Sequence, residues 1–284
     1  MTTLTRVLPA ETHMGWVHLN VRNLSRSLHF YADDLGLHEI GRDGSTATLS
    51  ADGSTPLLVL TELAAAPDRP RGTTGLYHAA IRLPGRPELA ALLRRLALHN
   101  VVFQGASDHL VSEALYLADP DGIGLELYRD RPRNEWPYSG DALQMSTLPL
   151  NLDSLLEEAD KAPKTRGIPP ATDMGHVHLN VSSLEAAHQF YVETFGFGAM
   201  VRFPGNALFV AAGGYHHHLG LNVWGGTRRP PEGVIGLHAF QILVPDAEGR
   251  DALRARLTEA GIETAPEGAG FSLRDMDGNH VVVG

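Results

Sequence analysis

Residues 11–40, ETHMGWVHLNVRNLSRSLHFYADDLGLHEI, recur 160 positions later as ATDMGHVHLNVSSLEAAHQFYVETFGFGAM, residues 171–200. Without gaps, 12 of the 30 positions are identical, including the run VHLNV and the Phe-Tyr pairs at 30–31 and 190–191. Unrelated segments do not agree to this extent, so the chain contains an internal duplication.

A weaker repeat extends the pattern to four modules. GLYHAAIRLPGRPELAALLRRLALHN (75–100) is similar to GLHAFQILVPDAEGRDALRARLTEAG (236–261), and LADPDGIGLELYRD (117–130) matches LRDMDGNHVVVG (273–284). The modules cover approximately residues 13–62, 75–130, 173–226 and 236–284.

Each module is predicted to be a βαβββ unit. An alternating, β-branched stretch such as WVHLNV or LYHAAIRL favours a strand. An amphipathic helix follows, with apolar side chains at 3.6-residue spacing. Those side chains are Leu24, Leu28, Tyr31 and Leu35 in the first module and Leu89, Leu92, Leu93 and Leu96 in the second. Turn signals such as Asp121-Gly122 separate three further strands.

The stretch 131–172 interrupts the modules. It contains six prolines and one helical segment, LDSLLEEADK (152–161), for which Asp153 is the predicted N-cap. We interpret this stretch as a linker that packs on the surface and has no catalytic role. The predicted domains are therefore residues 10–130, holding the first two modules, and residues 173–284, holding the last two.

Composition excludes several classes of protein. The chain of 284 residues carries a net charge of −10 and has no run of Lys or Arg, which disfavours binding to nucleic acid. It has no cysteine, so disulfides, thiol nucleophiles and cysteine-ligated metals are absent, and a metal site requires His and carboxylate ligands. No long apolar run or signal peptide is visible, so a cytoplasmic protein without membrane contact is expected.

The four modules resemble the vicinal oxygen chelate superfamily, and within it the two-domain extradiol ring-cleaving dioxygenases of the catechol 2,3-dioxygenase type. Three motifs carry the resemblance: GHVHLNV with FYVETFGF, the run HHHLG, and DHLVSEALYLADPDGIGLELY. It implies an α+β fold in which the modules form two glyoxalase-like half-barrel cups. It also implies an enzyme, expected as a homo-oligomer, that cleaves the ring of a small aromatic diol with O2. The bond cleaved lies next to the two hydroxyls and not between them.

The resemblance further implies Fe(II), less often Mn(II), held by two His and one Glu. The two His occupy the first strands of paired modules, and the Glu occupies the last strand of one of them. Position by position, these ligands fall on His78, His176 and Glu126. The corresponding positions of the outer modules hold Trp16, Ala239 and Val282.

This asymmetry bears on how the modules pair. One complete ligand set forms only if the second module faces the third, leaving the first with the fourth. In the alternative, the first and second modules pair and His18 joins His78 and Glu126. His238 is read as a packing or hydrogen-bonded residue.

The resemblance also implies three residues around the bound substrate. His217, the second His of HHHLG, matches the family's acid/base residue, and His218 is the alternative one register away. Tyr116 matches a tyrosine that hydrogen-bonds near the substrate oxygen, and His109 matches a pocket histidine.

Other readings of the same sequence stay open. Trp224, Phe203 and Phe209 are candidates to line the pocket, although core packing explains them equally. A glyoxalase- or epimerase-like metalloenzyme and a metal-free small-molecule binding protein are alternatives on the same fold.

Overall fold

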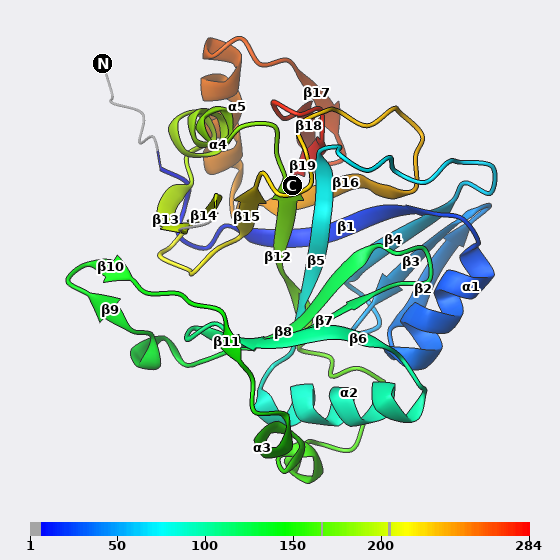
Figure 1. Ribbon diagram of the computed structural model, residues 1–284. Helices are drawn as coiled ribbons and strands as arrows, with labels where there is room; N and C mark the ends of the chain where they lie inside the picture. Colours follow the sequence, from blue (N-terminus) through cyan, green and yellow to red (C-terminus); the bar gives the residue numbers. More distant parts are fainter. Residues whose placement is uncertain (1–6, 166, 204–205) are drawn as a thin grey trace.

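Strands from opposite halves of the chain pair edge to edge in the computed structural model, which describes residues 7–165, 167–203 and 206–284. Two large sheets result, and each takes one module from each half (Figure 1). The second module pairs with the third and the first pairs with the fourth, as the sequence predicts. The alternative pairing of the first and second modules is wrong.

The nine-stranded sheet is built around the antiparallel pair of β5 and β12. Its strands, in spatial order, are β11 (Leu148–Pro149), β6 (Phe103–Asp108), β7 (Ser112–Ala118), β8 (Gly124–Asp130), β5 (Gly75–Arg82), β12 (Asp173–Asn180), β15 (Leu219–Asn222), β14 (Ala207–Ala211) and β13 (Gly198–Phe203).

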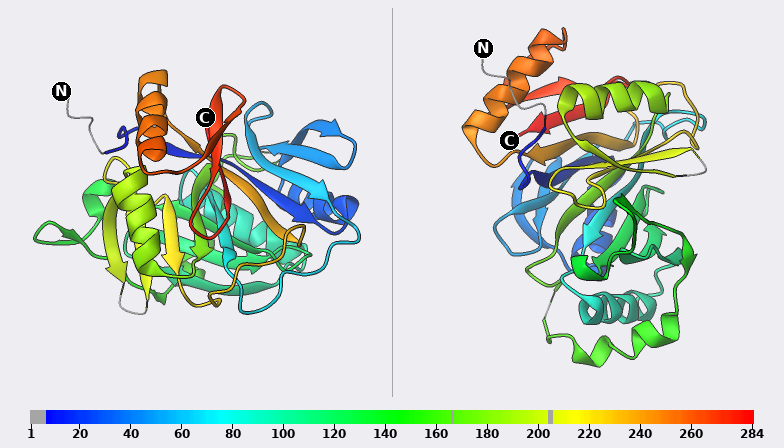
Figure 2. Two further views of the ribbon diagram at one scale, coloured as in Figure 1. Left: turned by 90° about the horizontal axis from the view of Figure 1, so that it is seen from above. Right: turned by 90° about the vertical axis from the view of Figure 1, so that its left-hand side faces the viewer.

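The eight-stranded sheet repeats this plan around the antiparallel pair of β1 and β16. Its strands, in spatial order, are β17 (Thr264–Glu267), β18 (Gly270–Arg274), β19 (His280–Val283), β16 (Gly236–Leu243), β1 (His13–Val21), β4 (Pro56–Glu62), β3 (Thr46–Ser50) and β2 (His38–Asp43). The two sheets are the expected half-barrel cups, and β1 lies against β12 between them (Figure 2).

Each module contributes one helical segment. These are α1 (Leu24–Leu28) with the π-helical His29–Asp34, α2 (Arg86–Leu98), α4 (Leu184–Ala187) with the π-helical His188–Phe195, and α5 (Ala247–Glu259). The predicted apolar face of α2 is buried, and α2 packs on β8. In the first module the regular helix ends at Leu28, but Leu24, Tyr31 and Leu35 are still buried because the π-helical turn continues the segment.

The stretch 131–172 forms a strap of short elements. They are a 3₁₀ turn at Arg133–Glu135, the hairpin β9 (Tyr138–Ser139) and β10 (Ala142–Leu143), strand β11, helix α3 (Leu152–Leu156) and a 3₁₀ turn at Ala159–Lys161. Helix α3 contacts α2. Its N-cap is Asn151, whose side chain accepts a hydrogen bond from Ser154 N, so the prediction of Asp153 is wrong. Asp153 lies inside the first turn, where its charge favours the helix dipole.

One hydrophobic core includes buried residues from both sheets. Fully buried side chains from the paired central strands, among them Val17 of β1, Ile81 of β5 and Val177 of β12, belong to it. A sheet anchored in this way keeps the polar residues of its opposite face in a fixed arrangement.

Candidate metal centre

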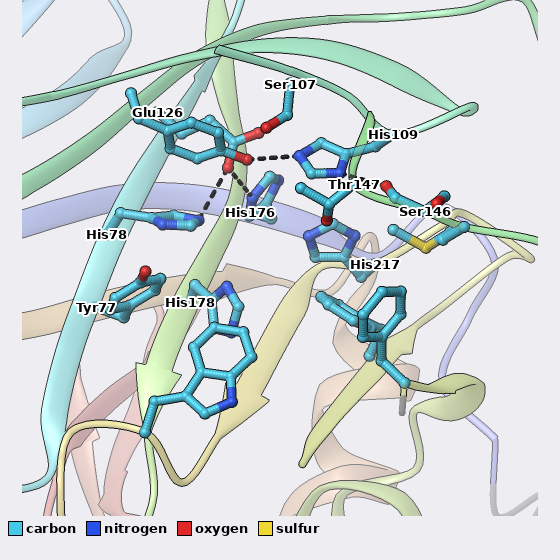
Figure 3. Close-up of a pocket in the computed structure, with 15 residues that line it drawn as sticks. Tyr77, His78, Ser107, His109, Glu126, Ser146, Thr147, His176, His178 and His217 are labelled. Carbon is cyan, nitrogen blue, oxygen red and sulfur yellow. Dashed lines mark hydrogen bonds and ion pairs between the residues drawn. The ribbon is translucent and has the colours of Figure 1, made fainter. Parts of the chain in front are cut away.

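The three residues predicted as metal ligands lie together on one face of the nine-stranded sheet (Figure 3). Ala80 of β5 is opposite both Glu126 of β8 and His176 of β12, and His78 is two residues before Ala80 on the same face. The register therefore brings one side chain from each of three neighbouring strands to one point. Their nearest ligand atoms all lie within 4.8 Å of one another, and all three residues are buried.

The charge state of this cluster suits a cation. Burial acts to raise the pKa of the Glu126 carboxyl, but the imidazoles of His176 and His78 outweigh burial and hold that pKa well below its usual range. Burial also lowers the pKa of His176 to about 4, against the opposing effect of Glu126. An ionised carboxylate and a neutral imidazole are the forms that bind metals.

An unsatisfied atom points to the same conclusion. His78 Nε2 lies 2.9 Å from Glu126 Oε2, yet it is buried and makes no well-aligned hydrogen bond with any described residue. His176 Nε2 lies 3.2 Å from the same oxygen. Buried polar atoms without a partner cost free energy, which a bound cation would offset. Two His and one carboxylate that leave further positions open are the donors of non-haem Fe(II) sites, so the residues present fit that metal.

The cluster forms one end of a cavity of about 260 Å³. Phe203, Phe209 and Trp224 line it, which settles the open choice between pocket and core for these three aromatic residues. Ser146 and Thr147 also line it. The stretch 131–172 therefore helps to form the cavity and does not only pack on the surface.

Tyr116 and His109 form a hydrogen-bonded pair beside the cluster. Tyr116 is opposite Glu126 in the register, and its hydroxyl is 2.6 Å from His109 Nε2. His109 Nδ1 donates to the carbonyl oxygen of Ser146 at 2.7 Å, so Nε2 accepts from the tyrosine. Burial, together with the charge of Glu126, raises the pKa of Tyr116 well above its usual value and keeps the phenol protonated.

His217 lines the cavity, and its ring centroid lies 4.0 Å from that of His176. Burial and the neighbouring histidines lower the pKa of His217 well below its usual value. His218 does not line the cavity. Its Nδ1 accepts a hydrogen bond from Ala212 N instead.

His18 lies in the other sheet and takes no part in this cluster. Its Nε2 is 2.8 Å from Thr61 Oγ1, and its ring contacts that of His238 with centroids 4.4 Å apart. The alternative that made His18 a ligand is therefore wrong. In that sheet Ala239 pairs with His18 and Val282 pairs with Gln241, so side chains that do not bind metals occupy the corresponding positions.

Sequence reasoning missed several residues around the site. Asp130, His216 and Tyr215 form a hydrogen-bonded group next to His217, in which His216 and Tyr215 are buried and Asp130 is partly buried. Tyr77 and His178 line the cavity. The side chain of His178 requires Gly220 on the neighbouring strand, because a Cβ there would lie 2.8 Å from the imidazole. The run HHHLG was the available signal for His216, and the alternation of β12 was the signal for His178.

Comparison with known proteins identifies the family. The model of the glyoxalase/bleomycin resistance protein/dioxygenase superfamily matches residues 13–127 and 173–283, and the chain belongs to this superfamily. The chain is 42% identical over 270 residues to a catechol-2,3-dioxygenase of Bacillus subtilis (strain 168), covering 93% of this chain and 94% of the relative. This similarity shows an enzyme of the ring-cleaving dioxygenase class.

Solved structures agree on the fold. A crystal structure from Bacillus subtilis subsp. subtilis str. 168 matches with a TM-score of 0.66 at 16% identity, covering 95% of this chain and 84% of that one. Glyoxalase I from Zea mays matches with a TM-score of 0.58 at 18% identity, covering 96% and 92%. Among the described residues, no helix combines the length and the apolar character needed to cross a membrane.

Proposed function

We propose that this protein opens a catechol-type aromatic diol with O2 by extradiol cleavage, at an Fe(II) or Mn(II) ion held by His78, Glu126 and His176. The observation that carries the proposal is the buried cluster of two His and one carboxylate at the end of an aromatic-lined cavity. The 42% identity to a catechol-2,3-dioxygenase supports the reaction type.

The cavity suits a single substituted ring. A cavity of about 150 Å³ is enough to hold benzene in another protein, so about 260 Å³ accommodates a monocyclic diol with a small substituent. Phe209 and Trp224 line the cavity and offer apolar contact to the ring of the diol. The two hydroxyls of the diol would then point toward the three metal-binding residues.

The metal would supply chelation of both hydroxyls, a lowered pKa for the bound diol and the redox chemistry of O2. The residues of the chain bind, orient and exchange protons. Glu126 offsets positive charge at the buried site. His217 takes a proton from the diol and returns it later. Before substrate binds, the Tyr116 hydroxyl donates to His109 Nε2 at 2.6 Å. With the diol bound, this hydroxyl turns from His109 to donate to a substrate oxygen as negative charge develops there.

Glu126 is the one carboxylate among the described residues that line the cavity. Glyoxalase- and epimerase-like sites of this fold instead place a carboxylate on both paired modules. The ligand set therefore favours dioxygenase chemistry over those alternatives.

The test is reconstitution without oxygen. The purified protein is loaded anaerobically with Fe(II), or with Mn(II) in parallel, and mixed with catechol and 4-methylcatechol before air is admitted. We expect equal consumption of O2 and diol, with the absorbance of a ring-opened semialdehyde. The Zn(II)-loaded protein serves as the redox-inactive control. Metal uptake without turnover of any diol, or tight diol binding without metal, would refute the proposal.

A further inference from the structure

His217 is joined through His216 to a partly buried carboxylate, that of Asp130. His217 Nδ1 lies 2.7 Å from His216 Nδ1, and His216 Nε2 lies 2.7 Å from Asp130 Oδ1. His216 is fully buried, and Asp130 is the last residue of β8. The three side chains form one hydrogen-bonded chain that leads from the end of this strand to the wall of the cavity.

The carboxylate is held by two further donors. Arg82 Nη1 lies 3.0 Å from Asp130 Oδ2, and the Tyr215 hydroxyl donates to the same oxygen at 2.9 Å. Burial acts to raise the pKa of Asp130, but the hydrogen bond from His216 and the charge of Arg82 leave it below its usual value. Asp130 is therefore ionised at neutral pH.

An ionised carboxylate fixes the direction of the bond between His216 and Asp130, and a neutral His216 fixes that of the bond between His216 and His217. The carboxylate can only accept, so the hydrogen of His216 must be on Nε2. A neutral His216 then has its lone pair on Nδ1 and accepts from His217. His217 must carry its hydrogen on Nδ1, which leaves Nε2 as an acceptor on a ring that lines the cavity.

We propose that Asp130 and His216 are positioning residues, which fix His217 in the Nδ1–H tautomer so that Nε2 accepts a hydrogen bond from a substrate hydroxyl. This inference rests on the proposed function only in identifying the hydroxyl as that of a diol. The tautomer of His217 is a property of the protein without substrate. The chain of bonds also holds the ring plane, because a ring flip would break the contact to His216. A cationic His216 would donate from both nitrogens and reverse the direction of its bond to His217.

Nuclear magnetic resonance tests the direction without any turnover. Protein labelled with ¹⁵N in the histidine rings is loaded with diamagnetic Zn(II), and the signals of His216 and His217 are assigned with His216→Gln and His217→Gln. In each ring the nitrogen without hydrogen resonates far from the nitrogen that carries one. We expect Nε2 of His217 and Nδ1 of His216 to be the nitrogens without hydrogen. The opposite pattern, or a doubly protonated His216, would overturn the inference.

Asp130→Asn tests whether the Asp130 carboxylate determines the tautomer of His217. Arg82 retains the amide oxygen as its acceptor, so the NH2 group faces His216 and reverses the chain. We expect the hydrogen of His217 to move to Nε2, and kcat of the Fe(II)-loaded enzyme to fall at least about 10²-fold with little change in KM. Asp173→Asn is the matched control, because Asp173 also pairs with Arg82, at 2.6 Å, but does not contact His216.

The outcomes separate the two proposals. An unchanged tautomer in Asp130→Asn, or the same shift in Asp173→Asn, would overturn the positioning role even in an active enzyme. Should Asp130→Asn fail to fold, the wild-type spectrum alone still decides the direction. A wild-type protein that shows the expected spectrum but cleaves no diol would overturn the proposed function and leave the tautomer assignment in place.

Discussion

Replacing Glu126 with Gln removes one negative charge from the candidate metal centre while keeping nearly the same shape. Even at the dielectric constant of water, a carboxylate at a bonding distance of about 2.1 Å attracts a dication by about 4 kcal/mol. The buried site screens this attraction less, so about 4 kcal/mol is a lower bound. The variant should therefore bind the metal at least about 1,000-fold more weakly.

Thermal unfolding measures this loss. With Mn(II) at about 1,000 times the wild-type Kd, binding stabilises the wild-type protein by about 4.1 kcal/mol, but the variant by only about 0.4 kcal/mol. At about 2–4 °C per kcal/mol, Tm should rise by about 8–16 °C in the wild type and by about 1 °C in the variant. Each protein is compared with its own metal-free form, so changes in intrinsic stability cancel.

Glu113→Gln is the matched control. Glu113 is a buried carboxylate of the same sheet, but its partners are Arg86, Arg129 and Arg131. This variant should lose intrinsic stability and keep the full increase in Tm with metal. An equal increase in Glu126→Gln and the wild type would refute the assignment of Glu126 as a ligand.

Three further predictions concern other parts of the molecule. Tyr116→Phe should keep its metal and lose about 10²-fold in kcat/KM, because it lacks the hydroxyl that donates to the substrate oxygen; unchanged kinetics would contradict this role. Gly220→Ala should lower the free energy of unfolding by about 1–3 kcal/mol through the clash with His178, whereas Gly105→Ala, with open space at its Cβ, should not. Burial raises the pKa of Asp119 from 3.8 to about 6, so the folded protein holds this proton more tightly and stability from Asp119 is lost as the pH rises between these values. The wild-type excess in unfolding free energy over Asp119→Asn, measured in urea, should fall by about 2 kcal/mol between pH 4.5 and 7, and a constant difference would refute the shift.

The repeat accounts for how much of the site could be predicted. Four homologous modules define equivalent positions in the sequence. The candidate ligands His78, Glu126 and His176 therefore stand out, because the outer modules have Trp16, Ala239 and Val282 at the equivalent positions. The same asymmetry predicted which modules share a sheet. Periodicity located the strands and helices because alternation and 3.6-residue spacing reflect which face is buried.

What the sequence could not provide depends on contacts between distant segments. Asp130 and His216 are 86 residues apart, and nothing local marks them as partners. The contribution of Ser146 depends on how the strap 131–172 folds back over β6, through the short pairing with β11. The N-cap of α3 was misplaced by two residues because Asn151 and Asp153 are both good capping residues, and local sequence does not decide between them.

The sharing of each sheet between the two halves constrains how the molecule is made. The candidate metal centre brings His78 of β5 next to His176 of β12, so the nine-stranded sheet can form only after a nascent chain has extended through β12. The eight-stranded sheet can form only after the chain has extended through β16, which pairs with β1. Neither half can finish folding on the ribosome ahead of the other, because each exposes unpaired strand edges until its counterpart arrives. We therefore expect that either half, produced alone, leaves the edges of its central strands unpaired, and that both sheets form only when the two halves are present together.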